Sequence, residues 1–219
     1  VGALEYSFDQ FWEHAGKKKV FFKCIKTRTF TKGFRLLLNA PRYAQKDLYW
    51  DLISHIQHAK ESILLTSPYF APDFRFMRVL KLARRRGVTV KIILPETSAV
   101  DLKNEWARKV TESFYDALIT AGIEIYAYTP RFLHAKTVII DNEYALIGSL
   151  NLDTLSFHFD YEASIESTNE RFVGEVQKQF EHDLSLSNRI NPETWKKRPL
   201  FIKITEIASY LFHRLIYPA

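Results

Sequence analysis

The chain has 219 residues, 47% of them hydrophobic and 15% aromatic, which suits one domain with a substantial core, with or without a tail. The formal net charge of +6 favours an anionic partner, such as nucleic acid or an acidic membrane surface, although such an excess of lysine also serves solubility alone. The single cysteine excludes a disulfide framework and a cysteine-rich metal site, and no apolar run approaches the ~20 residues that cross a bilayer.

Helical and strand patterns alternate along most of the chain. The predicted strands lie at residues 34–38, 62–66, 88–94, 123–128 and 161–166. One predicted helix ends near residue 14. Four further helices are predicted at residues 46–60, 74–86, 104–120 and 170–184. Asp73 is placed to cap one of these helices, and Gly87 is placed to end it. This order predicts an α/β fold in which helices flank a mixed, mostly parallel sheet.

Residues 132–151 carry the most informative pattern of the chain, H-x-K-x4-D-x6-G-S-x-N. Its fixed positions are His134, Lys136, Asp141, Gly148, Ser149 and Asn151. We expect a hairpin whose first strand includes positions 134 and 136, because residues two apart on a strand point to the same face. Each of these residues alone has an ordinary explanation in turns or sheet edges. All six at fixed spacing indicate a functional site.

The charges in this pattern suit chemistry on a phosphodiester, which is anionic and repels nucleophiles. Lys136 can neutralise the non-bridging oxygens, and the neutral imidazole of His134 is a plausible nucleophile. We count Asp141 and Glu162 with His134 and Lys136 as catalytic residues. Glu162 is expected to hold the tautomer of His134, and Asp141 is expected to fix the geometry of the turn. No metal or other cofactor is required, because the lysine supplies the electrostatic stabilisation that a divalent ion would otherwise give.

The end of the pattern is expected to bind phosphate. Gly148 has no side chain and lets the backbone come close to a ligand. Ser149 and Asn151, two residues apart, can offer hydrogen-bond donors to phosphate oxygens.

This six-position pattern resembles the HKD motif of the phospholipase D superfamily, and the resemblance extends over residues 40–188. Segments 67–73, 86–95 and 122–126 are similar to the second catalytic half of bacterial cardiolipin synthases, and residues 8–12 are similar to the helix that closes the first half. The resemblance implies a phospholipase D-like fold with one HKD half. It also implies a phosphatidyl transfer through a phosphohistidine, in which two phosphatidylglycerol molecules give cardiolipin and glycerol.

Family members use two HKD motifs that face each other, and this sequence contains one. The second half is therefore expected either upstream in a longer native chain or in a second copy of a homodimer. The start at Val1, inside what reads as a structured segment, favours the longer chain. The resemblance leaves open which of the two histidines is the nucleophile.

Three regions are expected. Residues 1–33 would close a preceding half-domain and link it to residues 34–190, the phospholipase D-like catalytic domain. Residues 191–219 form a basic, amphipathic tail in which a Lys-Lys-Arg cluster at 196–198 precedes a helical pattern over 200–217. Such a tail suits an anionic membrane surface, and a helix packed on its own domain would show the same pattern. The tail and the lipid-enzyme resemblance together favour association with a bacterial cytoplasmic membrane and with anionic phospholipid.

Other functions are compatible with the same motif. A phospholipase D hydrolase would use water as the acceptor, and a phospholipase D-like nuclease would act as a homodimer on nucleic acid. Nucleic acid is the less favoured partner, because the basic clusters are not interleaved along one strand or helix in a way that follows a phosphate backbone. A non-enzymatic, membrane-bound fragment is a further alternative.

Overall fold

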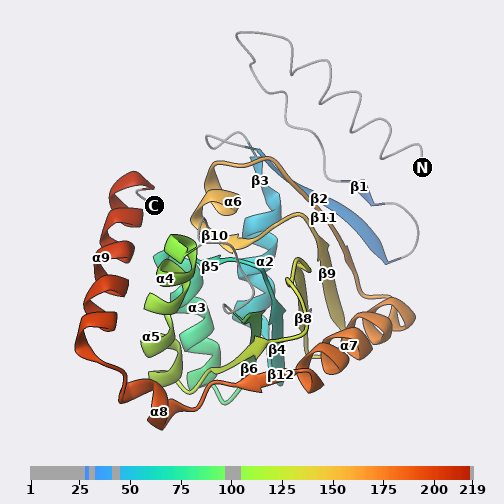
Figure 1. The fold of residues 1–219 in the computed structure, drawn as a ribbon. Helices are drawn as coiled ribbons and strands as arrows, with labels where there is room; N and C mark the ends of the chain where they lie inside the picture. The colour runs from blue at the N-terminus through green and yellow to red at the C-terminus, as the bar shows by residue number, and fades with distance from the viewer. Residues whose placement is uncertain (1–27, 30–32, 41–44, 97–104, 218–219) are drawn as a thin grey trace, which may run out of the picture.

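The structure, a computed structural model, describes residues 28–29, 33–40, 45–96 and 105–217 (Figure 1). The predicted helix end near residue 14, the similarity noted for residues 8–12 and most of the predicted linker lie outside these residues.

Strands form one large sheet and one small sheet. The strands of the large sheet are β1 (Arg28–Thr29), β2 (Phe34–Ala40), β3 (Gln45–Lys46), β4 (Ser62–Thr66), β6 (Thr89–Pro95), β7 (Glu124–Tyr128), β8 (Thr137–Ile140), β9 (Tyr144–Gly148), β11 (Glu162–Ser167) and β12 (Ser187–Arg189). Their order is β1-β2-β11-β9-β8-β4-β6-β7-β12, and β3 pairs with β2. The small sheet pairs β5 (Phe70–Ala71) with β10 (Leu152–Asp153).

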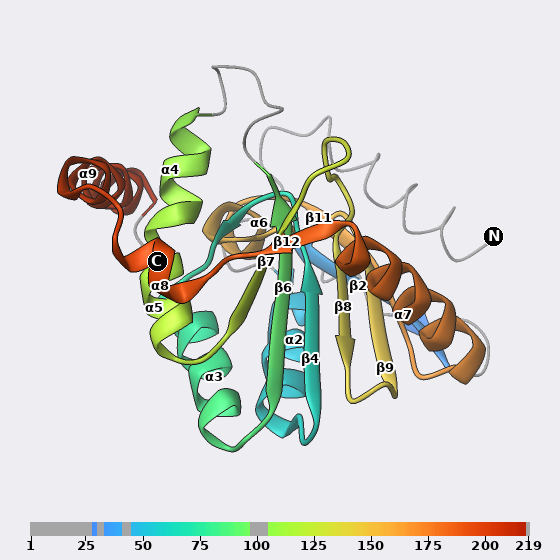
Figure 2. The ribbon, with the colours of Figure 1, turned by 60° about the horizontal axis from the view of Figure 1, so that its bottom comes forward.

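Helices cover both faces of the large sheet (Figure 2). They are α2 (Asp47–His58), α3 (Phe74–Arg85), α4 (Glu105–Ser113), α5 (Tyr115–Thr120), α6 (Thr154–His158), α7 (Glu170–Ser185), α8 (Pro192–Lys196) and α9 (Leu200–Ile216). In β4, the side chains of Ile63 and Leu65 join the core beneath α2 and α3, whereas Leu64 joins the core beneath α7. Two covered faces explain why the central strands are unbroken apolar runs in the sequence.

The large sheet is mostly antiparallel, so the prediction of a mostly parallel sheet is wrong. Among the described residues, β4–β6 and β6–β7 are its parallel pairs, and its other pairs are antiparallel. The parallel pairs are the ones connected through helices, since parallel neighbours need a crossover. Strands β8 and β9 form a hairpin, and β11 lies between β9 and β2. Local sequence patterns identify a strand but do not say which strand will lie beside it.

Several predicted elements are confirmed. Strand β4 has the predicted bounds, and the carboxylate of Asp73 accepts a hydrogen bond from the backbone N–H of Phe76 at 2.7 Å at the start of α3. Gly87 follows α3 with a φ of +96°. The single helix predicted for residues 104–120 is instead two helices, α4 and α5, separated by the buried Phe114.

The C-terminal tail forms α9, which lies beside α4 at one side of the molecule (Figures 1 and 2). The rings of Tyr210 and Phe114 meet edge to face with their centroids 5.4 Å apart. In the part of the chain that the structure describes, no helix combines the length and the apolar character needed to cross a bilayer.

The turn between β8 and β9 is fixed by Asp141. Its φ is +54°, in the left-handed region that Asp and Asn adopt more readily than most residues. Its carboxylate accepts hydrogen bonds from the backbone N–H groups of Lys60, Glu61 and Ser62 at 2.8, 2.8 and 2.9 Å. Burial would raise the pKa of Asp141, but these bonds outweigh burial and hold the pKa below its ordinary value. Asp141 thus ties the hairpin to the start of β4.

The Asp141→Asn variant should lose about 1–3 kcal/mol of unfolding free energy at pH 7, because its amide turns a donor toward backbone donors. Urea unfolding measures the loss. A carboxyl with a lowered folded pKa stabilises the protein above its unfolded pKa, and this stabilisation is lost as pH falls through the folded pKa. The difference in unfolding free energy between wild type and the variant should therefore be constant near neutral pH and should become smaller in acid.

The matched control is Asn142→Gly, since Asn142 has a φ of +56° that glycine adopts without strain. This control should unfold close to wild type. Equal unfolding of Asp141→Asn and wild type at pH 7 would show that the three hydrogen bonds do not hold the turn.

Candidate active site

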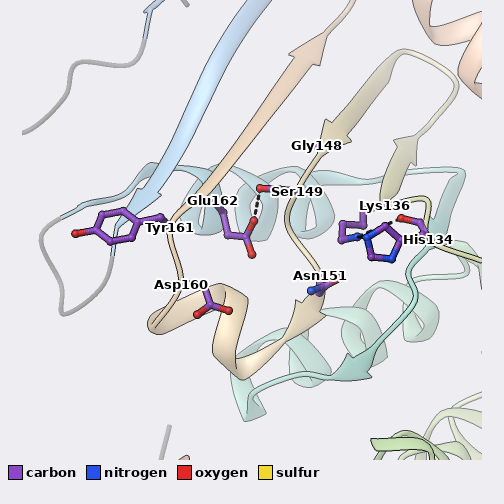
Figure 3. A pocket seen from close by; sticks show the side chains of 8 residues that line it. All are labelled: His134, Lys136, Gly148, Ser149, Asn151, Asp160, Tyr161 and Glu162. Atoms are coloured by element: carbon purple, nitrogen blue, oxygen red, sulfur yellow. Dashed lines mark hydrogen bonds between the residues drawn. The ribbon is translucent and has the colours of Figure 1, made fainter. Parts of the chain in front are cut away.

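The ends of three neighbouring strands surround an open cavity of about 680 Å³ (Figure 3). Its lining residues are His134, Lys136, Gly148, Ser149, Asn151, Asp160, Tyr161 and Glu162. Strands β8, β9 and β11 are consecutive antiparallel neighbours. The start of β8, the end of β9 and the start of β11 therefore lie at one edge of the sheet. This arrangement brings together five of the six motif positions and Glu162.

His134 and Lys136 precede β8 rather than lying on it, so the prediction that both are strand residues is wrong. They are nonetheless neighbours, with Nζ of Lys136 lying 3.2 Å from Nε2 of His134 and 3.1 Å from the carbonyl oxygen of His134. An ammonium can only donate, so Nε2 accepts from it, and the lone pair of Nε2 becomes free for another partner only when Lys136 moves away. The ring of Phe132 stacks on the imidazole with a centroid distance of 5.8 Å.

Lys136 has an electrostatic environment that suits an anionic ligand. Burial lowers its pKa from the ordinary value, and the negative charges of Glu162 and Asp153 act in the opposite direction. Burial also raises the pKa of Asp153 to about 6. The cation is thus partly desolvated. Its hydrogen bonds in the described residues go to Nε2 and the carbonyl oxygen of His134 and not to a carboxylate, which leaves its charge able to attract a phosphate oxygen.

Ser149 and Glu162 form a pair on the other side of the cavity (Figure 3). The Ser149 hydroxyl donates to Oε2 of Glu162 and accepts from the backbone N–H of Ala163 at 3.0 Å. The structure therefore places Glu162 in the pocket but bonds it to Ser149, not to His134 as expected. Because the Ser149 hydroxyl already donates its proton to Glu162, it could donate to a phosphate, as predicted, only after this hydrogen bond breaks.

Asn151 lines the cavity as expected. Its Oδ1 is buried and has no hydrogen-bond partner among the described residues. An unpaired buried amide oxygen costs free energy, so the side chain is suited to pair with a polar group that enters the cavity.

The structure explains the glycine at position 148 by a contact with a neighbouring strand, not by the predicted approach of a ligand to the backbone. A Cβ at this position would lie 2.4 Å from the carbonyl oxygen of Ala163 and 2.5 Å from Cα of Ser164. Both are backbone atoms of β11, which cannot move without opening the sheet. The glycine thus allows β11 to lie close to β9, and this contact determines where the cavity forms at the edge of the sheet.

Asp141 lies at the opposite end of β8 and does not line the cavity. Its inclusion among the catalytic residues is therefore not supported by position, whereas the expectation that it fixes the turn agrees with its hydrogen bonds. Sequence reasoning missed Asp160 and Tyr161, which line the cavity. Their position directly before Glu162 in Phe-Asp-Tyr-Glu was the available signal.

A second polar cluster anchors α6, which leads to Asp160. Nε2 of His158 lies 2.7 Å from Oδ2 of Asp73, and the Tyr49 hydroxyl donates to the same oxygen at 2.7 Å. Nζ of Lys46 lies 2.7 Å from Nδ1 of His158. These contacts join α2, α3 and α6 next to the cavity.

The protein-family model described as "Cardiolipin synthase, PLD-like domain" matches residues 52–184 of this chain. Similar proteins include the cardiolipin synthases of Clostridium perfringens strain SM101, at 31% identity, and Alkalihalophilus pseudofirmus, at 32% identity. The alignments cover 94% and 99% of this chain and 44% and 43% of those proteins. The chain thus spans less than half the length of these relatives.

Solved structures with a similar fold include Nuc from Salmonella typhimurium, a phospholipase D family member, with a TM-score of 0.57 and 19% identity. That alignment covers 71% of this chain and 99% of Nuc. The phosphatidylserine synthase of Haemophilus influenzae gives a TM-score of 0.66 at 14% identity, over 84% of this chain and 47% of the synthase. At these identities the likeness establishes the fold alone.

The Gly148→Ala variant should be destabilised by about 1–3 kcal/mol or more, because the added methyl collides with the backbone of β11. Gly174→Ala is the matched control, since a Cβ there has nothing within 4 Å and Gly174 lies inside α7. The control should gain about 0.5–1 kcal/mol, as alanine favours a helix interior. Thermal unfolding of both variants gives the comparison. A Gly148→Ala protein as stable as wild type would mean that the strands are not in close contact.

Proposed function

Because the chain belongs to the family described as the phospholipase D-like domain of cardiolipin synthase, we propose that it is one catalytic half of a phosphatidyltransferase. The substrate would be phosphatidylglycerol, with cardiolipin and glycerol as products. The observation that carries this proposal is the His134–Lys136 pair at the edge of an open cavity, with an accepting Nε2 beside a partly desolvated cation.

The proposed first step is the attack of His134 Nε2 on the phosphorus of phosphatidylglycerol. The bond between phosphorus and the glycerol oxygen breaks, and that oxygen takes a proton from the imidazole of an opposing half and leaves as glycerol. Lys136 would move from Nε2 to a non-bridging oxygen as charge develops there. The product of this step is a phosphatidyl-histidine.

In the second step a hydroxyl group of another phosphatidylglycerol gives its proton to the opposing imidazole and attacks phosphorus. The phosphorus–nitrogen bond breaks, cardiolipin leaves, and both imidazoles return to their initial states. The opposing half would come from the same longer chain or from a second copy, because this chain supplies one motif. If water were the acceptor instead, the product would be phosphatidic acid.

The His134→Ala variant should lose cardiolipin formation by at least about 1,000-fold, because no group remains at that position to take the phosphatidyl group. The assay uses a preparation that contains both halves, and it measures cardiolipin, glycerol and phosphatidic acid from phosphatidylglycerol. His182→Ala is the control, since His182 is exposed on α7 and outside the cavity. Turnover by His134→Ala at the wild-type rate would refute the assignment. Phosphatidic acid as the main product would identify a hydrolase, and salt-sensitive cleavage of single-stranded DNA would identify a nuclease.

Burial lowers the pKa of Lys136 below the ordinary lysine value of 10.5, so its positive charge is lost at a lower pH than that of an exposed lysine. The value of kcat/KM should therefore begin to fall at a pH below 10.5. Lys136→Arg should be slower, since the guanidinium differs in shape, but it should retain its charge to higher pH. The pH dependence of kcat/KM for the two proteins measures this. An alkaline limb at the same pH in both would show that Lys136 is not the group that titrates.

A further inference from the structure

Helix α9 packs with its polar side against the protein and its apolar side outward. Glu206 and His213 are buried at 3% and 5% exposure. The outward side, which we call the α9 outer face, consists of Leu200, Phe201, Ile204, Ile207, Leu211 and Leu215. Leu200 and Leu215, near its two ends, are 72% and 81% exposed. This orientation is the reverse of the one that surface helices of globular proteins adopt.

The inward contacts of α9 explain why it holds this orientation. Nη2 of Arg198 donates to Oε2 of Glu206 at 3.1 Å, and the Arg198 guanidinium lies 3.2 Å from the centroid of the Trp195 ring. Nζ of Lys203 donates to the carbonyl oxygen of Lys196 at 2.8 Å. A rotation of the helix that buried the apolar stripe would break this ion pair, and a buried charge without its partner is costly.

The α9 outer face follows the whole helix. The helix has 17 residues and is therefore about 25 Å long, and its exposed apolar side chains recur from Leu200 to Leu215. Apolar patches of this extent on a soluble surface mark sites of interaction with proteins or membranes. The charge around it decides between these partners.

Basic residues dominate the segment that holds the helix. Residues 191–219 contain five Lys and Arg but two Asp and Glu, and one of the two acids, Glu206, is paired with Arg198. Lys196 and Lys197 are exposed directly before the helix. An apolar stripe with lysines at its margin is complementary to an anionic bilayer, in which acyl chains receive the stripe and headgroups receive the charges.

The helix also connects to the mouth of the cavity. The ring of Tyr217, directly after α9, lies 6.2 Å from the ring of Phe159. Phe159 is exposed and immediately precedes Asp160 and Tyr161, which line the cavity. Aromatic side chains that are half apolar and half polar are suited to the boundary between lipid and water. The C-terminal end of α9 therefore lies close to the segment that leads to the rim of the cavity.

We propose that the α9 outer face docks on an anionic lipid bilayer, with the helix lying in the plane of the headgroups and the cavity mouth beside it. The docking itself is inferred from the exposure and charge of α9 and does not depend on the reaction. That docking also delivers the lipid phosphate to His134 rests on the proposed function.

The experiment is sedimentation of the protein with vesicles of 30% phosphatidylglycerol and 70% phosphatidylcholine, compared with phosphatidylcholine alone. The double variant Ile207→Gln/Leu211→Gln should bind the anionic vesicles at least about tenfold more weakly than wild type, since glutamine retains helix propensity but removes the apolar stripe. Removing Lys196 and Lys197 as Gln should weaken binding about fivefold for each charge. Wild type should bind phosphatidylcholine alone less tightly than the anionic vesicles.

The matched control is Leu82→Gln/Leu186→Gln, which changes two leucines that are 38% and 39% exposed, one in α3 and one directly after α7. It should bind vesicles as wild type does, and circular dichroism should show that both double variants are folded. His134→Ala should also bind as wild type does, so a failure of the proposed chemistry is distinguishable from a failure of docking. Short-chain phosphatidylglycerol in solution should be turned over equally by wild type and the α9 variant.

Equal vesicle binding by wild type and the α9 double variant would overturn the proposal. Light scattering provides the second arm. A stable dimer that depends on Ile207 and Leu211, with no vesicle binding, would assign the same face to contact between copies of the chain and would equally overturn it.

Discussion

The contact between Gly148 and the backbone of β11 is the constraint on which the candidate site depends. Only a glycine lets β11 pair with β9 at this point, because a Cβ would lie 2.4 Å from a backbone oxygen. The pairing places the start of β11 beside the end of β9 and the start of β8. Three segments that are separate in the sequence then share one cavity. The site is therefore a consequence of strand order at a sheet edge.

The motif divides into residues that bring polar atoms to the cavity and residues that build its walls. His134 and Lys136 present an imidazole nitrogen and an ammonium that are bonded to each other, and Asn151 presents an unpaired amide oxygen. Asp141 and Gly148 hold the hairpin and the neighbouring strand instead. The same six-residue pattern thus specifies both the chemistry and the scaffold, which explains why its spacing is so specific.

The sequence predicted local features well and neighbour relations poorly. The bounds of β4 and the cap at Asp73 follow from apolar patterning and side-chain chemistry, which act over a few residues. The antiparallel order of the sheet, the division of α4 from α5 at Phe114 and the bond between Ser149 and Glu162 depend on tertiary contacts. The outward apolar side of α9 belongs to the same group, because a helical pattern shows that a stripe exists but not which way it faces.

The central claim is that the imidazole of His134 captures phosphorus covalently. The most direct measurement is rapid acid-free quenching of a preparation that holds both halves, after mixing with phosphatidylglycerol labelled in its phosphate, followed by mass spectrometry of the peptide that contains His134. The account predicts a phosphatidyl adduct on Nε2 of His134 whose phosphorus–nitrogen bond survives mild base and is lost in acid, and which decays as the phosphatidylglycerol is consumed. An adduct confined to another residue, or none during active turnover, would contradict it.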